Sequence, residues 1–383
     1  MRIAFYAPLK PPDHPVPSGD RTVARAWIAL LARLGHEVQV VCRLRTREVG
    51  DPDRIARLDH LGARAARLLL RRFARGRRPR PDLWFTYHPY PKAPDPLGPV
   101  VAHRLGIPLV VAEPSLSRRQ AIGPLAARHR AVRDLLARAR LVLVPTRRDM
   151  PALIPHLRPD TPLVHLPPFL DTAPHRAAAA HRVRHRGALA RELGLDPARP
   201  WLLAVAMMRP GVKAESWRLL AAALARLEGP SWHLLAVGDG PLGGAIATEL
   251  RRLGPRVRLL GARPPETLPP LYAACDLLVW PGIGEAYGMV YLEAQASGLP
   301  VVAVRSAGVP EVVDADVGNV LVAEADPAAY AAAVARLLAD AGALRARGLC
   351  ARRRVVAVHD LAAAARRVGP RLAALAGCGE RAP

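Results

Sequence analysis

Short apolar runs alternate with longer amphipathic segments along the first half of the chain. Residues 2–6 and 37–42 predict strands, and residues 22–34 between them place Trp27 and Leu31 on one face of a predicted helix, which Asp20 is positioned to cap. Strand, loop, helix and strand in succession form the unit of a parallel α/β sheet. Further runs of the same kind predict strands at 82–88, 108–113, 141–146 and 164–169.

The same alternation restarts at residues 201–206 and continues to the end of the chain. Predicted strands at 233–237, 257–260, 276–281, 300–303 and 318–322 are separated by predicted helices at 216–227, 245–253, 268–275 and 330–340. Between the halves, residues 172–200 are richer in Ala, Arg, His and Pro, and we expect a linker with one helix at 188–193. The predicted organisation is therefore an N-terminal domain at 1–172, a linker at 173–200, a second domain at 201–355 and C-terminal helices at 356–383.

Basic residues are concentrated in the first half. Of a net charge of +24 over 383 residues, residues 1–190 contribute +20, with 34 Lys and Arg against 14 Asp and Glu. Such a field favours anionic partners, namely a membrane surface, phosphorylated substrates or nucleic acid, although arginine-rich solvated helix faces would give the same excess.

The predicted helix at 54–78 carries much of this charge. Its apolar stripe consists of Leu61, Leu68, Leu69 and Phe73, and the remaining positions are largely arginine. Two interpretations stay open: an amphipathic helix at a membrane surface, or a core-packed helix with a solvated basic face.

The cysteines and the hydropathy pattern indicate the cellular compartment in which the protein is expected. Cys42, Cys275, Cys350 and Cys378 are far apart and form no C-x-x-C, so we expect reduced thiols and no metal site. No apolar run approaches ~18 residues, the length needed to span a bilayer. The expectation is a cytoplasmic protein, or one that contacts the inner face of a membrane from the cytoplasm.

The candidate chemistry is concentrated at residues 282–294. A glycine-rich turn after the strand at 276–281 leads into a predicted helix starting near Gly288, whose free N–H groups and dipole would favour a phosphate. Glu285 precedes this helix. Glu293 lies inside it, about 7–8 Å along the axis from the start of the helix near Gly288. Two hydroxyl-bearing groups joined by a pyrophosphate, as in a nucleotide-sugar, would fit this spacing.

Gly-Glu-Ala-Tyr-Gly-Met at 284–289, followed by Glu-Ala-Gln-Ala-Ser-Gly-Leu-Pro-Val-Val-Ala at 293–303, resembles the nucleotide-sugar region of the GT-B glycosyltransferases of family 4. Residues 306–311, Ser-Ala-Gly-Val-Pro-Glu, resemble the G-G-x-P-E segment of the same family. The resemblance implies an α/β GT-B fold, with two Rossmann-like parallel-sheet domains facing a cleft and the last helices returning to the first domain. It implies a retaining, metal-independent glycosyltransferase that needs no cofactor beyond the nucleotide-sugar co-substrate.

The family also suggests roles for individual residues. Glu285 would hold sugar hydroxyls and Glu293 the ribose hydroxyls, while Gly19 would approach the diphosphate from the other domain. The departing diphosphate would be stabilised by the cations Arg209 and Lys213 and by the N–H groups of Tyr287, Gly288, Met289 and Val290. The family's Arg and Lys are often spaced as R-x-x-x-x-K-G, whereas here the spacing is one residue shorter and Ala214 replaces the Gly.

The acceptor side departs from the family pattern. Family members often place a His after the strand matched here by 110–112, but this chain has Glu113 there. Glu113 and His88, at the end of the preceding strand, are the acceptor-side candidates. A lipid-linked molecule or a polysaccharide is the expected kind of acceptor.

Other interpretations remain. Residues 238–243, Gly-Asp-Gly-Pro-Leu-Gly, fit the dinucleotide fingerprint G-x-G-x-x-G but lie deep in the chain and lack the following acid, which disfavours a dehydrogenase. Asp51-Pro52-Asp53 and Asp314-Ala315-Asp316 match D-x-D without a buried strand before them, which disfavours metal binding. The alternatives to a transferase are a nucleotide-sugar epimerase on the same fold and a non-catalytic basic module that binds membranes or nucleic acid, with nucleic acid the less expected partner.

Overall fold

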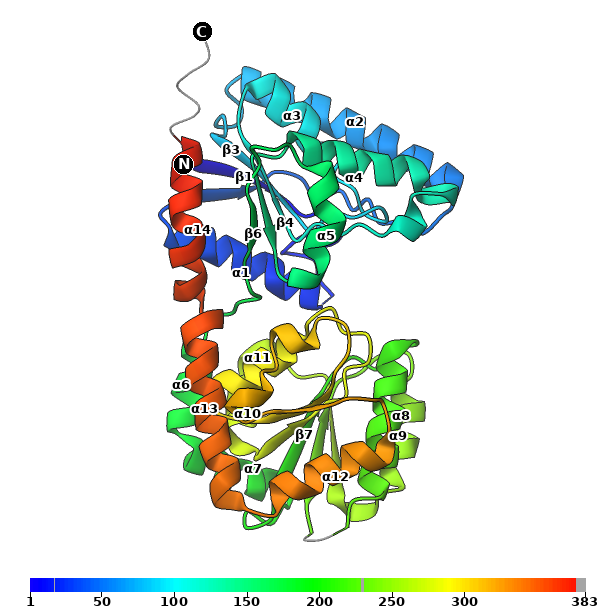
Figure 1. Ribbon diagram of the computed structural model, residues 1–383, viewed down its shortest axis with the longest axis vertical. Helices are drawn as coiled ribbons and strands as arrows, with labels where there is room; N and C mark the ends of the chain where they lie inside the picture. Colours follow the sequence, from blue (N-terminus) through cyan, green and yellow to red (C-terminus); the bar gives the residue numbers. More distant parts are fainter. Residues whose placement is uncertain (17, 229–230, 377–383) are drawn as a thin grey trace. The chain divides into compact units, whose positions relative to one another are not determined.

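The computed structural model describes residues 1–16, 18–228 and 231–376, and its chain divides into two compact units (Figure 1). Unit 1 comprises Met1–Pro167 together with the chain from Leu361 onward, and unit 2 comprises Pro168–Asp360. The predicted C-terminal segment 356–383 is therefore divided between the two units, and its last residues, 377–383, lie outside the described part. None of the helices in the described ranges is both long and apolar enough to cross a membrane.

Unit 1 is built on a six-stranded sheet whose neighbouring strands are all parallel, in the order β2-β1-β3-β4-β5-β6. The strands follow the predicted apolar runs but are up to three residues shorter. Their bounds are Arg2–Tyr6 for β1, Glu37–Val40 for β2, Leu83–Tyr87 for β3, Leu109–Ala112 for β4, Leu141–Val144 for β5 and Leu163–His165 for β6.

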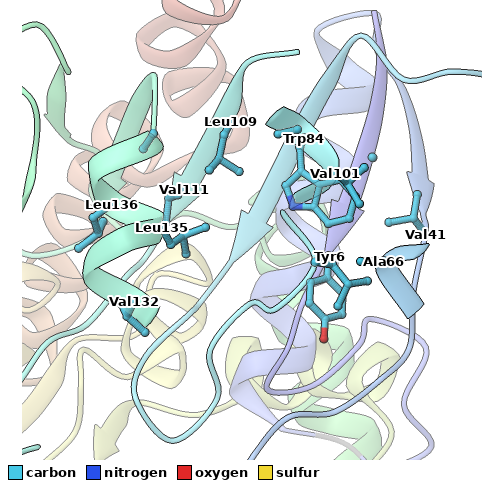
Figure 2. Close-up of a cluster of buried hydrophobic side chains, with 14 of the residues drawn as sticks. Tyr6, Val41, Ala66, Trp84, Val101, Leu109, Val111, Val132, Leu135 and Leu136 are labelled. Carbon is cyan, nitrogen blue, oxygen red and sulfur yellow. The ribbon is translucent and has the colours of Figure 1, made fainter. Parts of the chain in front are cut away.

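Helices cover both faces of this sheet. On one face the buried cluster of Figure 2 joins β1, β3 and β4 to helices α2, α3 and α4, with Trp84 and Tyr6 among its largest side chains. Helix α1 packs Trp27 against Phe85 of β3, with ring centroids 5.2 Å apart, and α14 packs against α1. The helices span Gly19–Arg33 for α1, Pro52–Ala74 for α2, Gly98–Leu105 for α3, Ala126–Arg138 for α4, Met150–Leu153 for α5 and Leu361–Ala376 for α14.

Helix α1 begins earlier than its apolar pattern predicts. Ser18 is the N-cap, and its hydroxyl accepts a hydrogen bond from the Arg21 backbone N–H at 3.3 Å. The prediction that Asp20 caps the helix is therefore wrong. Asp20 lies in the first turn, where its negative charge favours the helix dipole and its side chain is available for another partner.

Unit 2 repeats the architecture with a second all-parallel sheet in the order β12-β11-β10-β7-β8-β9. Its strands again follow the predicted runs. Their bounds are Trp201–Val205 for β7, His233–Val237 for β8, Val257–Gly261 for β9, Leu277–Val279 for β10, Val301–Val304 for β11 and Val320–Val322 for β12.

Figure 1 shows helices α8 and α9 on one side of this sheet and α6, α10, α11 and α13 on the other. The prediction of a single helix in the linker segment 173–200 is wrong, because this segment forms α6 and α7, which both pack on α10 inside unit 2. The helices span Ala173–Ala180 for α6, Arg182–Leu193 for α7, Val212–Ala225 for α8, Gly243–Arg251 for α9, Leu268–Ala274 for α10, Met289–Ala296 for α11, Pro327–Leu338 for α12 and Ala341–His359 for α13.

The carboxylate of Asp276 attaches helix α7 to the second sheet, at the end where strands β7 and β10 begin. Asp276, just before β10, accepts hydrogen bonds from Arg182 at 2.5 Å and Arg186 at 2.9 Å, and from the backbone N–H of Trp201 at 2.8 Å. Arg186 also stacks on the Trp201 ring, 4.4 Å from its centroid. The three charged side chains therefore join helix α7, strand β7 and strand β10 at one point.

Each sheet has one place where the strand order reverses. In unit 1 the chain runs from β1 outward to β2 and then returns to β3 on the other side of β1, and in unit 2 β10 likewise lies on the opposite side of β7 from β8. In parallel sheets of this kind, ligands bind beyond the carboxyl ends of the strands at such a reversal. The loops after β1 and β3, and those after β7 and β10, are therefore the places to search for chemistry.

Candidate functional site

The loop between β10 and α11 is shaped by two glycines that pack on Tyr291. Gly282 and Gly288 have φ of +69° and +81°, and a Cβ on either would lie within 2.6 Å of the Tyr291 ring or hydroxyl. The Tyr291 hydroxyl in turn donates to the carbonyl of Trp280 at 3.1 Å. As predicted, a helix then begins next to Gly288, with Met289 as its first residue, so the first N–H groups of α11 have no acceptor within the helix.

Hydroxyl groups from helix α8 and from the loop after β11 fix the backbone of this turn. Ser216 of α8 accepts a hydrogen bond from Ile283 N–H at 3.0 Å, and Ser306, after β11, accepts one from Gly284 N–H at 2.8 Å. The loop after β11 also contains Ala307 at φ +45°, the position at which the family resemblance has a glycine. Sequence analysis missed both serines, because only the fold brings their hydroxyls to the turn.

Lys213 and Glu285 meet at the reversal point between β7 and β10. The Lys213 ammonium contacts Glu285 Oε1, and the Trp280 indole N–H donates to the same oxygen at 3.1 Å. Each charged side chain is about 15% exposed, and the Lys213 ammonium lies 5.3 Å from the centre of the Trp280 ring. Both contacts use Oε1, so within the described residues Glu285 Oε2 is left available to a ligand.

Glu293 is anchored in a similar way, through one oxygen. Its Oε2 accepts a hydrogen bond from the buried Tyr272 hydroxyl at 2.8 Å, and the structure shows no contact for Oε1 within the described residues. Burial raises the pKa of Glu293, while the Tyr272 hydrogen bond acts in the opposite direction. The residue as a whole nevertheless keeps partial exposure.

His175 of α6 lies beside Tyr272 and Ser297, which both form hydrogen bonds with Glu293. Its ring lies 5.9 Å from the Tyr272 ring, and its Nδ1 lies 3.0 Å from the hydroxyl of Ser297, which donates to the Glu293 carbonyl. Burial lowers the pKa of His175 to about 4, so the ring is neutral at pH 7. Neither His175 nor Tyr272 could be found from a motif, because they lie 118 and 21 residues before Glu293.

The other predicted donor residues of unit 2 lie on the same loops. Arg209 is exposed in the loop after β7, and within the described residues no ion pair involves it. Tyr287 is partly exposed before the helix, Met289 is buried and Val290 is partly exposed in its first turn. The structure thus brings Lys213 and Glu285 into contact and leaves Arg209 directed to solvent.

Residues 238–243 are engaged with the loop after β7. Met208 N–H donates to the carbonyl of Asp239 at 2.7 Å, and Leu242 N–H donates to the carbonyl of Met208 at 2.9 Å. These backbone groups are already paired, so the turn has fewer free N–H groups with which to hold a pyrophosphate. This is consistent with the expectation that the segment is not a dinucleotide fingerprint.

The reversal point of unit 1 carries a second polar cluster. His88 follows β3 and Glu113 follows β4, and both adopt φ near +55°, a backbone conformation that is strained for these residue types. The His88 Nδ1 lies 3.3 Å from the Asp20 carboxylate in a geometry that falls short of a hydrogen bond, and Trp27 N–H donates to Glu113 at 3.1 Å. Gly19, the remaining predicted site residue, is the first residue of α1 in this unit.

The charges around His88 shift its pKa. Burial lowers the pKa of His88, but Asp20 raises it, with smaller contributions from Glu113 and Asp149, and the balance lies above the ordinary value. In return, the pKa of Asp20 is lowered: burial opposes ionisation, but His88 and Lys10 outweigh it. The surroundings of His88 therefore favour the charged imidazole more than those of an isolated histidine would.

We expect Asp20→Asn to lower the pKa of His88, because burial then acts against a weaker opposing charge. Since the folded pKa of His88 is raised, the pair stabilises the protein fully below about pH 6.5, and this stabilisation is lost as the pH rises through the raised pKa. Ring resonances of His88 followed by NMR against pH, together with thermal unfolding from pH 5 to 9, would measure both effects. Asp13→Asn, which breaks the exposed pair with Arg43, is the matched control and should leave the His88 titration unchanged; an unchanged titration in Asp20→Asn would contradict the assignment.

In both D-x-D segments the first aspartate accepts hydrogen bonds from nearby backbone N–H groups. Asp51 caps α2 by accepting from Asp53 and Arg54 N–H, and Asp314 accepts from Asp316 N–H at the start of a 3₁₀ turn. In the part of the chain that the structure describes, no three His, Cys, Asp or Glu residues are grouped as metal ligands. Cys42, Cys275 and Cys350 are free thiols, and Cys378 lies outside the described residues.

Comparison with known proteins agrees with this geometry. Residues 199–340, which include Lys213, Glu285 and Glu293, match the family model described as glycosyl transferases group 1. The matched segment lies within unit 2. D-inositol 3-phosphate glycosyltransferases of Nocardia farcinica and Salinispora arenicola are 34% and 33% identical to this chain over 192 and 186 residues, which is 47% and 46% of the chain. The matched segments span 42% and 41% of those relatives, less than half of their length.

Solved structures extend the likeness beyond residues 199–340 to the whole fold. Anabaena Alr3699/HepE in complex with UDP has a TM-score of 0.73 at 19% identity, covering 98% of this chain and 100% of that protein. Sucrose-phosphate synthase from Thermosynechococcus elongatus has a TM-score of 0.74 at 22% identity, covering 99% and 100%. The chain has the GT-B fold, as predicted.

Proposed function

We propose that the protein is a retaining, metal-independent glycosyltransferase that transfers a hexosyl group from a nucleotide-sugar to a hydroxyl-bearing acceptor. The observation that supports this most strongly is that the two glutamates of unit 2 are held in the same way. Glu285 and Glu293 are each held by one carboxylate oxygen, and the other oxygen of each has no hydrogen bond or ion pair within the described residues. Such a pair suits two hydroxyl-bearing groups at the ends of a diphosphate.

The diphosphate would lie between these carboxylates. The N-terminus of α11 provides N–H groups of Met289 and Val290 and a positive dipole end, and Lys213 provides a cation that is already oriented by Glu285 and Trp280. Stabilisation of the departing diphosphate by such preorganised groups lowers the barrier without a metal ion. Arg209 is close enough in sequence to add a second cation when a ligand is bound.

Uridine diphosphate sugars are the proposed donors. Anabaena Alr3699/HepE has been solved in complex with UDP and with UDP-glucose, and the latter structure has a TM-score of 0.71 to this chain. The neutral Tyr272 and His175 behind Glu293 would keep that carboxylate oriented toward the ribose hydroxyls. The comparisons do not favour the epimerase or the non-catalytic basic module.

Unit 1 would receive the acceptor. His88, whose pKa Asp20 raises, can donate a hydrogen bond to an anionic or hydroxyl group, and Glu113, which replaces the histidine frequent in the family, can accept one. The cytoplasm, where nucleotide-sugars are available, is the proposed location. A lipid-linked acceptor and a polysaccharide are both compatible with these groups.

Glu293→Ala is expected to weaken UDP binding about 10- to 100-fold, because hydrogen bonds to a charged group contribute about 1.5–3 kcal/mol. Glu285→Ala is expected to leave UDP affinity within about threefold and to slow release of UDP from UDP-glucose, because its contacts would be with the sugar. Calorimetric titration with UDP and a UDP-release assay would measure the two effects.

The exposed Glu266 provides the matched control, and Glu266→Ala should alter neither quantity. Wild-type UDP affinity in Glu293→Ala would refute the ribose role. No binding of UDP or UDP-glucose by the unmodified protein would refute the proposed donor class.

A further inference from the structure

Helix α2 of unit 1 has two sharply different faces. Its buried side consists of Gly62, Ala66, Leu69 and Phe73, which recur every three to four residues and pack on the sheet. Exposed arginines at the same spacing occupy the opposite side. We call this set the arginine face of α2: Arg57, Arg64, Arg67, Arg71, Arg72 and Arg75.

No acidic group of the described residues neutralises the arginine face. The acids at and within α2 lie at its start or act elsewhere: Asp51 caps the helix, Asp53 lies in its first turn, and Asp59 pairs with the buried Arg128 at 3.3 Å. Arg54, just before the face, pairs with Glu48 at 3.2 Å. The ion pairs of the helix are thus confined to its first two turns, and the later turns carry uncompensated positive charge.

This arrangement opposes helix stability. Arg64 and Arg67, Arg67 and Arg71, and Arg71 and Arg75 are three or four residues apart, where like charges on a helix repel each other. An external negative surface would remove this repulsion and gain attraction at the same time. The arginine face is therefore better suited to a bound anionic partner than to water alone.

A leucine lies among these arginines. Leu68, predicted from sequence to belong to the apolar stripe of this helix, is 47% exposed and lies outside the buried side. Arginines attract anionic lipid headgroups, and an exposed apolar side chain among them can enter the boundary between headgroups and acyl chains. Apart from His60, helix α2 exposes no aromatic or amide side chain with which to stack on bases or read their edges, which disfavours nucleic acid.

The helix is also held firmly against unit 1. Gly62 lies so close to Pro96 that a Cβ at this position would come within 2.4 Å of the proline ring. Figure 1 shows α2 at the outside of unit 1, with α3 and α4 beside it. The arginine face is consequently presented to solvent as a fixed surface.

We propose that the arginine face of α2 binds the surface of an anionic lipid bilayer, with Leu68 entering the headgroup boundary. This surface is separate from the donor loops, and the proposal does not depend on the transfer reaction. The phosphates or carboxylates of acidic headgroups would replace the missing acidic partners of the arginines.

The test uses the full chain and vesicles of phosphatidylcholine alone or with about 30% phosphatidylglycerol, separated by sedimentation. We expect binding only to the anionic vesicles, decreasing as salt is raised from about 0.1 to 0.5 M. Arg64, Arg67, Arg71 and Arg75 all changed to Gln should reduce the partition coefficient about 100- to 1000-fold. Leu68→Ser should reduce it by a smaller factor with the salt dependence unchanged.

The matched control removes the same charge at exposed arginines outside the face, with Arg104, Arg119, Arg138 and Arg336 all changed to Gln. Vesicle binding that falls equally in both fourfold variants would overturn the proposal, since net charge alone would then explain it. Loss of duplex DNA binding in the α2 variant with vesicle binding retained would also overturn it, in favour of nucleic acid. UDP titration of each variant reports whether it is folded.

Discussion

Replacing Lys213 by methionine is expected to slow UDP release from UDP-glucose about 100- to 1000-fold, because one preorganised group that stabilises transition-state charge is worth this much in other enzymes. Lys213 is about 15% exposed, contacts Glu285 and lies over Trp280, so its charge is held in a partly dry position before any ligand arrives. UDP affinity should fall less than turnover if the ammonium acts mainly on the developing charge.

The variant leaves Glu285 without its cation, so a second variant is needed to separate the two effects. In the Lys213→Met, Glu285→Gln double variant no unpaired carboxylate remains, and we expect turnover to stay low while thermal stability recovers. Lys92→Met, a change of the same kind in unit 1, is the control. Turnover within about threefold of wild type in Lys213→Met would exclude this lysine from the chemistry.

Asp276→Ala is expected to lower the free energy of unfolding of unit 2 by about 3 kcal/mol, the lower end of the range for breaking a buried ion pair. The substitution leaves Arg182 and Arg186 without the carboxylate that joins them to Trp201 N–H. The lower end applies because the Arg182 side chain is 31% exposed and keeps access to water. Calorimetric unfolding should show a transition shifted downward by about 6–12 °C.

Two further variants define the cause of that loss. Asp160→Ala breaks surface pairs with Arg140 and Arg158 and should change stability by less than about 1 kcal/mol. Replacing Asp276, Arg182 and Arg186 together by apolar residues should recover much of the stability, because no uncompensated charge is then left behind. If the single and triple variants are equally unstable, packing rather than charge explains the role of Asp276.

The sequence predicted the parts of the fold that depend on local pattern. Apolar runs located every strand of both sheets, and the glycine-rich turn before Met289 located the start of α11. Glu285 and Glu293 could be singled out because the turn and the helix that carry them are contiguous in sequence. The chemistry that each residue performs still rests on the proposed donor.

What the sequence could not provide is the set of long-range partners. Trp280 is close to Glu285 in sequence, but the orientation of its indole N–H follows from the packing of β10. His175 reaches the Glu293 network only because residues 173–193 form two helices that pack on α10, where a linker with one helix was expected. Alanine and arginine are strong helix formers. The prediction of a linker gave more weight to the change in composition at residues 172–200 than to this helix propensity.

Errors at helix ends and on helix faces have equally local causes. Ser18 and Asp20 are both good cap residues, and only the backbone conformation shows that the serine precedes the first turn. Leu68 and Leu69 both fit an apolar stripe, since adjacent positions differ by only about 100° around a helix. Packing decides between them, and it buries Leu69.

The contact of Gly282 and Gly288 with Tyr291 restricts how this protein can be altered by directed evolution. Any side chain at either glycine would displace the tyrosine and, with it, the turn that presents Glu285. A library aimed at a new sugar preference should therefore keep these three positions constant and randomise Ala286, which is exposed, and Val290, which is partly exposed.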